Sequence, residues 1–217
     1  EGLRLNGAHI DSPRLDLKPN PVYEKSDLAY FKTHYYGGIR KYQWGATPLS
    51  MHGVIVKKSG EIVEVNIGEQ EGDPVFCVTD LLPHLAAEQN MRPIKDGLKG
   101  EELNVIIGSI PYVDEAKIKE PVKLLALQLL NERYGITEAD FFRAEIELVP
   151  AHKASDVGLD RSMIGAYGQD DRVCAYTALM AEIETENPVY TTVTILTDKE
   201  EIGSVGNTGL NSDYVLH

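Results

Sequence analysis

Residues 191–204 read TTVTILTDKEEIGS, a run of β-branched and apolar residues that ends in acidic ones. A near-continuous β-branched run is typical of a strand that is buried on both faces of a sheet. In open parallel sheets, ligands bind at the carboxyl ends of the strands. The adjacent residues Glu200 and Glu201 follow such an end, where one glutamate can bind a metal and the other can act as a general base. Taken alone, the segment is more simply explained as a solvated acidic turn.

A second acidic cluster lies directly before a predicted helix. Residues 168–172 read GQDDR, and the apolar spacing of residues 173–183 predicts a helix. Asp170 or Asp171 can serve as the N-cap of this helix and interact favourably with its dipole. The functional alternative is that Asp170 points out of a sheet edge and bridges two metal ions.

A histidine and an aspartate follow the first predicted strand, Leu3 to Ala8. His9 and Asp11 are two residues apart, a spacing that in a strand places both side chains on one face. A histidine that binds a metal usually donates its other ring N–H to a carboxylate or a carbonyl. Asp11 could hold His9 in this way, although a surface histidine beside a turn is the simpler explanation of this pattern alone.

The three clusters carry more weight together than separately. A hydrolytic site with two zinc ions needs histidine or carboxylate ligands on each ion, one bridging carboxylate and one free carboxylate base. Four residues match these types, and each follows a predicted strand or opens a helix: His9, Asp170, Glu200 and Glu201. The combined pattern predicts a two-metal hydrolase.

The middle of the chain is rich in β-strand and turn signals, whereas its two ends are α/β-like. Alternation over Arg14–Lys18 stops at Pro19 and Pro21, which we expect to break the strand. Three further elements are expected, namely a hairpin with a turn at residues 57–60, a helix over Pro121–Tyr134 that ends at Gly135, and a strand over Ala144–Val149. We therefore predict a β-rich domain, residues 20–149, inserted into an α/β domain formed by residues 1–19 and 150–217.

Composition excludes several classes of partner. The chain has 217 residues and a net charge of −13, which argues against binding of nucleic acid or of anionic membranes. No run of about 18 apolar residues is present, so no transmembrane helix is expected. The two cysteines, Cys77 and Cys174, form no metal or disulfide motif and fit a reducing cytoplasm.

Five stretches of the sequence resemble a known family. They are the segments GAHIDSPRLDLKP (7–19), WG with PLS (44–45 and 48–50), LPHLA (82–86), QDDR (169–172) and KEEIGS (199–204). Together they resemble the signature motifs of the aspartyl aminopeptidase / aminopeptidase I family of zinc metallopeptidases, and the resemblance runs from end to end. The extension of the histidine motif through Pro19 is its most specific part.

The resemblance implies a zinc-peptidase three-layer α/β sandwich with an inserted, mostly β domain that makes subunit contacts. It implies a cytoplasmic homo-oligomer, a dodecamer, that removes N-terminal residues from peptides with two zinc ions per site. The family's roles fall on His9 as a ligand of one zinc, Asp11 as its support, Asp170 as the bridging ligand, Glu200 as the general base and Glu201 as a ligand of the other zinc. The family also places the peptide bond after the bridging aspartate, here Asp170–Asp171, in cis.

The chain departs from the family pattern near its end. The family completes its site with a further aspartate and a final histidine downstream of the two glutamates, and this sequence ends at His217. We therefore expect a fragment that lacks the C-terminal part and is inactive by itself. Two alternatives stay open: the related tetrahedral glutamyl-aminopeptidase group, and an inactive fragment or assembly subunit.

Overall fold

The computed structural model describes residues 2–114 and 117–213 and divides into two compact units. The site unit comprises residues 1–13, 36–38 and 153–217, and the β-rich unit comprises residues 14–35 and 39–152. The β-rich unit thus begins at residue 14 and not at the predicted residue 20. The reason is that strand β2 (Arg14–Lys25) pairs with β8 (Ala144–Pro150) from its first residues onward.

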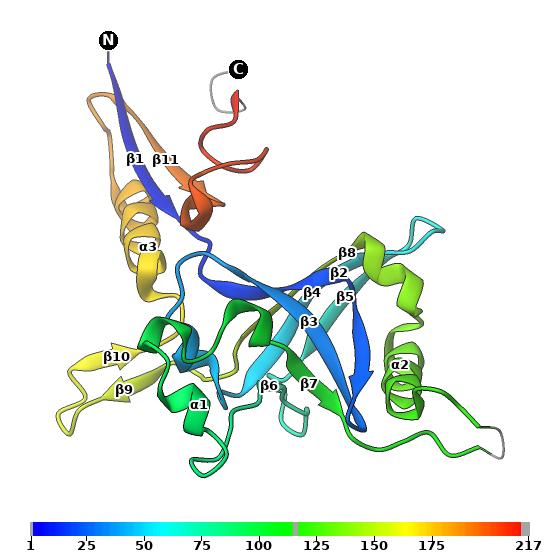
Figure 1. Ribbon diagram of the computed structural model, residues 1–217. Coiled ribbons are helices and arrows are strands. Elements are labelled where there is room, and N and C mark those ends of the chain that lie inside the picture. Colours follow the sequence, from blue (N-terminus) through cyan, green and yellow to red (C-terminus); the bar gives the residue numbers. More distant parts are fainter. Residues whose placement is uncertain (1, 115–116, 214–217) are drawn as a thin grey trace. The chain divides into compact units, whose positions relative to one another are not determined.

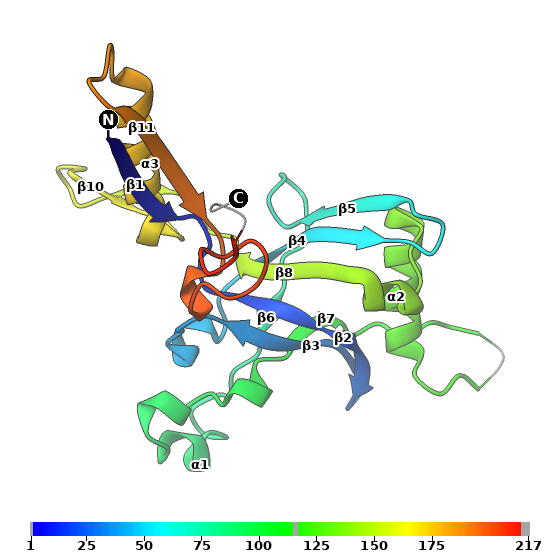
Figure 2. The same ribbon diagram turned by 90° about the horizontal axis from the view of Figure 1, so that it is seen from above.

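A seven-stranded sheet forms the frame of the β-rich unit, in the order β5-β4-β8-β2-β3-β7-β6 (Figures 1 and 2). The pairings of β8 with β2 and β4, of β4 with β5, and of β7 with β3 and β6 are antiparallel. The strands not yet given are β3 (Leu28–Tyr36), β4 (Leu49–Val56), β5 (Ile62–Ile67), β6 (Cys77–Val78) and β7 (Val105–Gly108).

Two kinds of helix accompany the strands of the chain. The α-helices are α1 (Ala87–Asn90), α2 (Pro121–Tyr134) and α3 (Gln169–Glu184). Four short 3₁₀ helices belong to the β-rich unit, namely Lys41–Trp44, Ile94–Asp96, Gly100–Glu102 and Glu138–Arg143. A fifth, Glu200–Ile202, belongs to the site unit. Within the described ranges no helix combines the length and the apolar character that crossing a membrane requires.

The apolar core lies in the β-rich unit. Its most deeply buried side chains come from five strands and the segment before β7, and they include Leu15, Phe31, Leu49, Met51, Ile55, Leu103, Val105 and Leu148. The predicted hairpin is confirmed, with Val56 opposite Ile62 across the turn. The predicted helix α2 is also confirmed, and Gly135 ends it in the left-handed conformation at φ +63°.

The two prolines of β2 do not break the strand, so the predicted end at Lys18 is wrong. β2 continues to Lys25 through Pro19 and Pro21. Successive backbone nitrogens of a strand point to opposite edges, so two prolines spaced by two residues remove donors from one edge alone. The register of β2 with β8 involves Leu15 and Asp16, which precede both prolines. The missing donors therefore lie beyond that paired segment.

A parallel strand pair forms the sheet of the site unit. β1 (Leu3–His9) pairs with β11 (Thr191–Thr197), and His9 lies opposite Thr197 (Figure 1). Helix α3 packs beside both strands, and its Glu182 accepts hydrogen bonds from the hydroxyls of Thr192 and Thr194. A hairpin of β9 (Ser155–Val157) and β10 (Met163–Gly165) completes the described elements.

This arrangement confirms the α/β character of the unit. Apart from the β9–β10 hairpin, the described residues of the unit form one sheet layer and one helix layer, and the expected third layer is not among them. The expectation that residues 191–197 are buried on both faces is wrong: Val193 and Leu196 are exposed by 36% and 38%. Within the described part of the unit, only β1 pairs with β11, which leaves much of its surface uncovered.

Candidate active site

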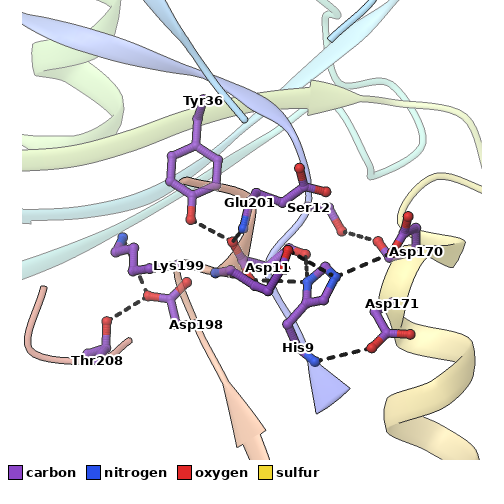
Figure 3. Close-up of polar contacts among 11 residues, drawn as sticks. His9, Asp11, Ser12, Tyr36, Asp170, Asp171, Asp198, Lys199, Glu201 and Thr208 are labelled. Atoms are coloured by element: carbon purple, nitrogen blue, oxygen red, sulfur yellow. Dashed lines mark hydrogen bonds and ion pairs between the residues drawn. The ribbon is translucent and has the colours of Figure 1, made fainter. Parts of the chain in front are cut away.

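The site is built where the two parallel strands end. Because His9 and Thr197 are the last residues of β1 and β11 and lie opposite each other, the segments that follow them leave the sheet at the same edge. The backbone N–H of Ile10 donates to the carbonyl of Thr197 at 2.9 Å and holds the two exits together. The polar residues predicted from both segments therefore converge, as Figure 3 shows.

Asp11 lies at the centre of these contacts, and its side chain is 1% exposed. The hydroxyl of Tyr36 donates to its Oδ2 atom at 2.6 Å. The backbone N–H groups of Glu200 and Glu201 donate to Oδ1 and Oδ2, each at 3.2 Å. Burial by itself would raise the pKa of Asp11, but the hydrogen bond from Tyr36 and those from the two N–H groups outweigh it and lower that pKa. Asp11 is therefore a carboxylate that ties three segments together.

His9 is oriented by Asp11. Its Nδ1 atom lies 3.0 Å from the carbonyl oxygen of Asp11 and 3.2 Å from its carboxylate, so Nδ1 carries the donated proton. Burial would lower the pKa of His9, but the hydrogen bond to the carbonyl and the charges of Asp11 and Glu200 raise it. The lone pair of Nε2 then faces the other carboxylates, which is the orientation that a metal-binding histidine adopts.

Asp170 and Asp171 stand at the start of α3. Both have non-helical backbone angles, and the peptide bond between them is cis, as expected. The hydrogen bonds from Cys174 lower the pKa of Asp171, and the backbone bond among them is the one an N-cap makes. Asp171 also accepts the backbone N–H of His9 at 3.3 Å. Its neighbour Asp170 instead directs Oδ1 to within 3.3 Å of Nε2 of His9 (Figure 3).

The two glutamates open the 3₁₀ turn after β11. The Glu200 carboxylate is largely exposed and lies 3.7 Å from Nε2 of His9. Glu201 is more enclosed, and burial, the largest effect, raises its pKa although the N–H of Gly38 and the nearby His9 act in the opposite direction. The adjacent side chains thus differ: one is open to solvent next to the histidine and the other is held by the chain around Gly38.

The donors fit part of a zinc site. Two ligands at 2.0–2.1 Å from a tetrahedral zinc lie about 3.4 Å apart. His9 Nε2 and Asp170 Oδ1 are 3.3 Å apart, as two ligands of one ion would be. Throughout residues 2–114 and 117–213, however, no three His, Cys, Asp or Glu side chains are grouped as a metal site. Among the described residues, the predicted metal ligands approach one another in pairs and do not complete the coordination shell of a zinc ion.

Tyr36 and Ser12 make hydrogen bonds in the site that the sequence motifs did not indicate. Tyr36 is the last residue of β3 and enters the site unit about 165 positions before Glu201, and no spacing in the sequence connects the two. Ser12 donates to the carbonyl of Asp170 at 3.4 Å. A tyrosine followed by two glycines, Gly37 and Gly38, was the signal that could have drawn attention to Tyr36.

A cavity of about 650 Å³ adjoins these residues. Its wall is mainly apolar and comes from the uncovered face of β1 and β11 and from the loop that follows Glu201. The residues that line it include Leu5, His9, Ile195, Glu200 and Leu210. Polar groups at one end of an apolar hollow are the usual make-up of a small-molecule or peptide site.

Comparison with known proteins identifies the relatives of the chain. It is 56% identical over 213 residues to a probable M18 family aminopeptidase 1 of Clostridium acetobutylicum, covering 98% of this chain and 46% of that protein. Its fold matches the crystal structure of an M18 family aminopeptidase from Thermotoga maritima with a TM-score of 0.94 and 54% identity, covering 99% of this chain and 47% of the other. The S. cerevisiae mApe1 dodecamer has a TM-score of 0.68 at 19% identity, covers 99% and 48%, and shows the fold alone.

The chain spans about half the length of the curated relatives it matches. A family model described as aminopeptidase I zinc metalloprotease (M18) matches residues 1–217. This match extends over the whole sequence and includes every residue of the candidate site. The chain therefore belongs to the M18 family of aminopeptidase I zinc metalloproteases.

Proposed function

We propose that the complete protein containing this chain is a two-zinc aminopeptidase that hydrolyses the N-terminal residue of peptides. The observation that carries the proposal is the cluster at the ends of β1 and β11, where Nε2 of His9 faces Asp170 at 3.3 Å and Glu200 at 3.7 Å. The family match supports the aminopeptidase I group over the related glutamyl group.

His9, Asp170 and Glu201 are the residues that would hold zinc, with Asp170 shared between two ions. Zinc bound there would polarise the scissile carbonyl and favour deprotonation of the attacking water. Glu200 would accept the proton of that water, since of the two glutamates it is the exposed one and its carboxylate lies next to the histidine nitrogen. Asp11 would keep the Nδ1 proton of His9 in place and so leave Nε2 free to bind metal.

The experiment uses the complete gene product, freed of metal and then supplied with zinc. Hydrolysis of leucyl and aspartyl chromogenic amides, abolished by a chelator and restored by zinc, is the expected result. A peptide with an acetylated N-terminus is the matched control, and it should resist cleavage because an aminopeptidase requires the free amine. Cleavage of the acetylated peptide as well as of the free-amine substrates, or activity that no chelator affects, would contradict the proposal.

The 217-residue chain alone should lack this activity. Three ligands are needed on a catalytic zinc, and the described residues present no group of three. The relatives are about twice as long, so we propose that the remaining ligands come from further sequence of the complete protein. Zinc titration of the isolated chain, followed by calorimetry, should show weak binding; tight binding with turnover would show that the site is complete in this chain.

We also propose that the β-rich unit mediates homo-oligomer contacts in the cytoplasm. The segment between β6 and β7 exposes several large apolar side chains that nothing else in the described unit covers: Leu81, Leu82, Leu85, Met91 and Ile94. Leu85→Glu together with Met91→Glu should reduce the sedimentation coefficient of the complete protein. Leu159→Glu, at an exposed position of the site unit, is the control and should leave it unchanged.

A further inference from the structure

We propose that residues 36–38 position the metal-binding side chains, with the hydroxyl of Tyr36 as the group that fixes Asp11. The inference rests on the proposed function, because it assigns a role in the same zinc site. Tyr36, Gly37 and Gly38 are a three-residue segment that the chain contributes to the site unit between two stretches of the β-rich unit. No motif or comparison assigns them a role.

The first observation is the contact of Tyr36 with Asp11. At 2.6 Å it is the shortest of the contacts of the Asp11 carboxylate, and the tyrosine is 5% exposed. A short hydrogen bond to a buried carboxylate is of the strong, charge-assisted kind. Without the hydroxyl, Oδ2 of Asp11 would keep the longer bond from the N–H of Glu201. Tyr36 is therefore the principal constraint on the rotation of the Asp11 side chain.

This constraint matters because Asp11 also contacts the histidine and both glutamates of the site. The same carboxylate lies against Nδ1 of His9 and accepts the N–H groups of Glu200 and Glu201. A rotation of Asp11 would therefore change the orientation of the histidine and loosen the turn that carries both glutamates. The tyrosine acts on the site through Asp11, so Tyr36 is a positioning residue.

The second observation concerns Glu201. Gly37 has φ +77°, and a Cβ atom built on it would lie 3.0 Å from Oε2 and 3.1 Å from Cβ of Glu201. The glycine permits both this backbone conformation and the close approach of Glu201. The segment thus fixes one carboxylate through Tyr36 and lies against another at Gly37.

The test is Tyr36→Phe in the complete gene product, which keeps the ring beneath the Lys199 ammonium and removes the hydroxyl alone. Loss of an outer-shell hydrogen bond of this kind typically weakens metal binding by about 10–100-fold. Zinc affinity is measured by competition with a chelating dye, and thermal unfolding of the zinc-free protein is measured in parallel. Tyr35→Phe is the matched control, because Tyr35 is the neighbouring, more exposed tyrosine.

The expected result is weaker zinc binding by Tyr36→Phe while its zinc-free form stays folded at the assay temperature, and no change in Tyr35→Phe. Unchanged zinc affinity in Tyr36→Phe would overturn the inference. A zinc-free Tyr36→Phe protein that is already unfolded at the assay temperature would also overturn it, because the loss of zinc affinity would then follow from loss of folding and the role would be structural. If the wild-type protein neither binds zinc nor cleaves peptides, the proposed function fails instead.

A second pair of variants tests the glycine contact independently. Gly37→Ala places a methyl group against Glu201, whereas Gly60→Ala adds one at φ +89° with no atom within 4 Å. Both carry the strain of a positive φ, so their difference isolates the crowding of Glu201. Gly37→Ala should weaken zinc binding by about 10-fold or more and Gly60→Ala should not. Equal zinc affinities of the two variants would count against the segment as a positioning element.

Discussion

The two units of the chain bury different kinds of side chain. In the β-rich unit the deepest positions are mainly apolar and come from the strands of one sheet. In the site unit the buried side chains are those of three polar residues, His9, Asp11 and Ser12, together with Tyr36 and two alanines, Ala8 and Ala175. Its large apolar side chains, such as Leu5 and Val193, are instead exposed.

The difference shows which interactions stabilise each unit. Burial of apolar area is the dominant favourable term in folding, and the β-rich unit has it in full. The described part of the site unit depends on hydrogen bonds that converge on one carboxylate, Asp11. Such bonds are specific in geometry and modest in net free energy. The site unit is therefore well suited to position side chains and less well provided with an apolar core.

The largest expected effect is a loss of turnover in the site unit without a loss of its structure or its zinc. Glu200→Gln in the complete protein should reduce turnover by about 10²–10⁴-fold, because the general base is lost. Zinc content should stay near the wild-type value. Glu201→Gln should instead release zinc, since that residue is the proposed ligand. Metal analysis and steady-state kinetics of both variants decide the matter, and the reverse pattern would exchange the two roles.

The next prediction tests the difference in apolar packing between the β-rich unit and the site unit. Leu148→Ala, at a fully buried position of β8, should lower the free energy of unfolding by about 2–5 kcal/mol because it leaves a cavity. Leu3→Ala in β1, whose leucine is 55% exposed, should change it by no more than about 0.5 kcal/mol. Urea denaturation of the 217-residue chain measures both. Equal effects would show that the site unit contributes apolar packing that its exposed residues do not suggest.

A smaller effect concerns a capping box of the β-rich unit. The backbone N–H and the hydroxyl of Thr137 donate to Asp140 at 2.9 and 2.8 Å, and with Arg143 they lower the pKa of Asp140. Asp140→Ala should cost about 1 kcal/mol at pH 7.

The pH dependence of this cost has a defined sign. The folded pKa of Asp140 lies below its ordinary value of 3.8, so its stabilising effect is present above pH 3.8. The effect is lost as the pH falls from 3.8 through the folded pKa. The free energies of unfolding of wild type and Asp140→Ala should therefore converge in acid. Denaturation at pH 7 and pH 3 measures this, and a constant difference would show that the charge of Asp140 is not what stabilises the turn.

Much of the site could be predicted from residue type and local spacing. His9 and Asp11 are two positions apart after a strand, and Glu200 and Glu201 follow another strand, so their places at strand ends were readable in the chain. The helix over Pro121–Tyr134 was equally readable, because its apolar spacing, its first proline and its final glycine all act within a few residues. The motifs of the M18 family supplied the roles that spacing left open.

Tertiary structure decided the features that depend on partners distant in sequence. Strand β2 continues through Pro19 and Pro21 because pairing, not local preference, determines where a strand ends. Burial of β11 depends on what covers its faces, which the β-branched run alone could not show. Tyr36 reaches Asp11 across 25 residues of chain. Local sequence specifies backbone conformation and residue chemistry, whereas the approach of distant segments is a property of the packed fold.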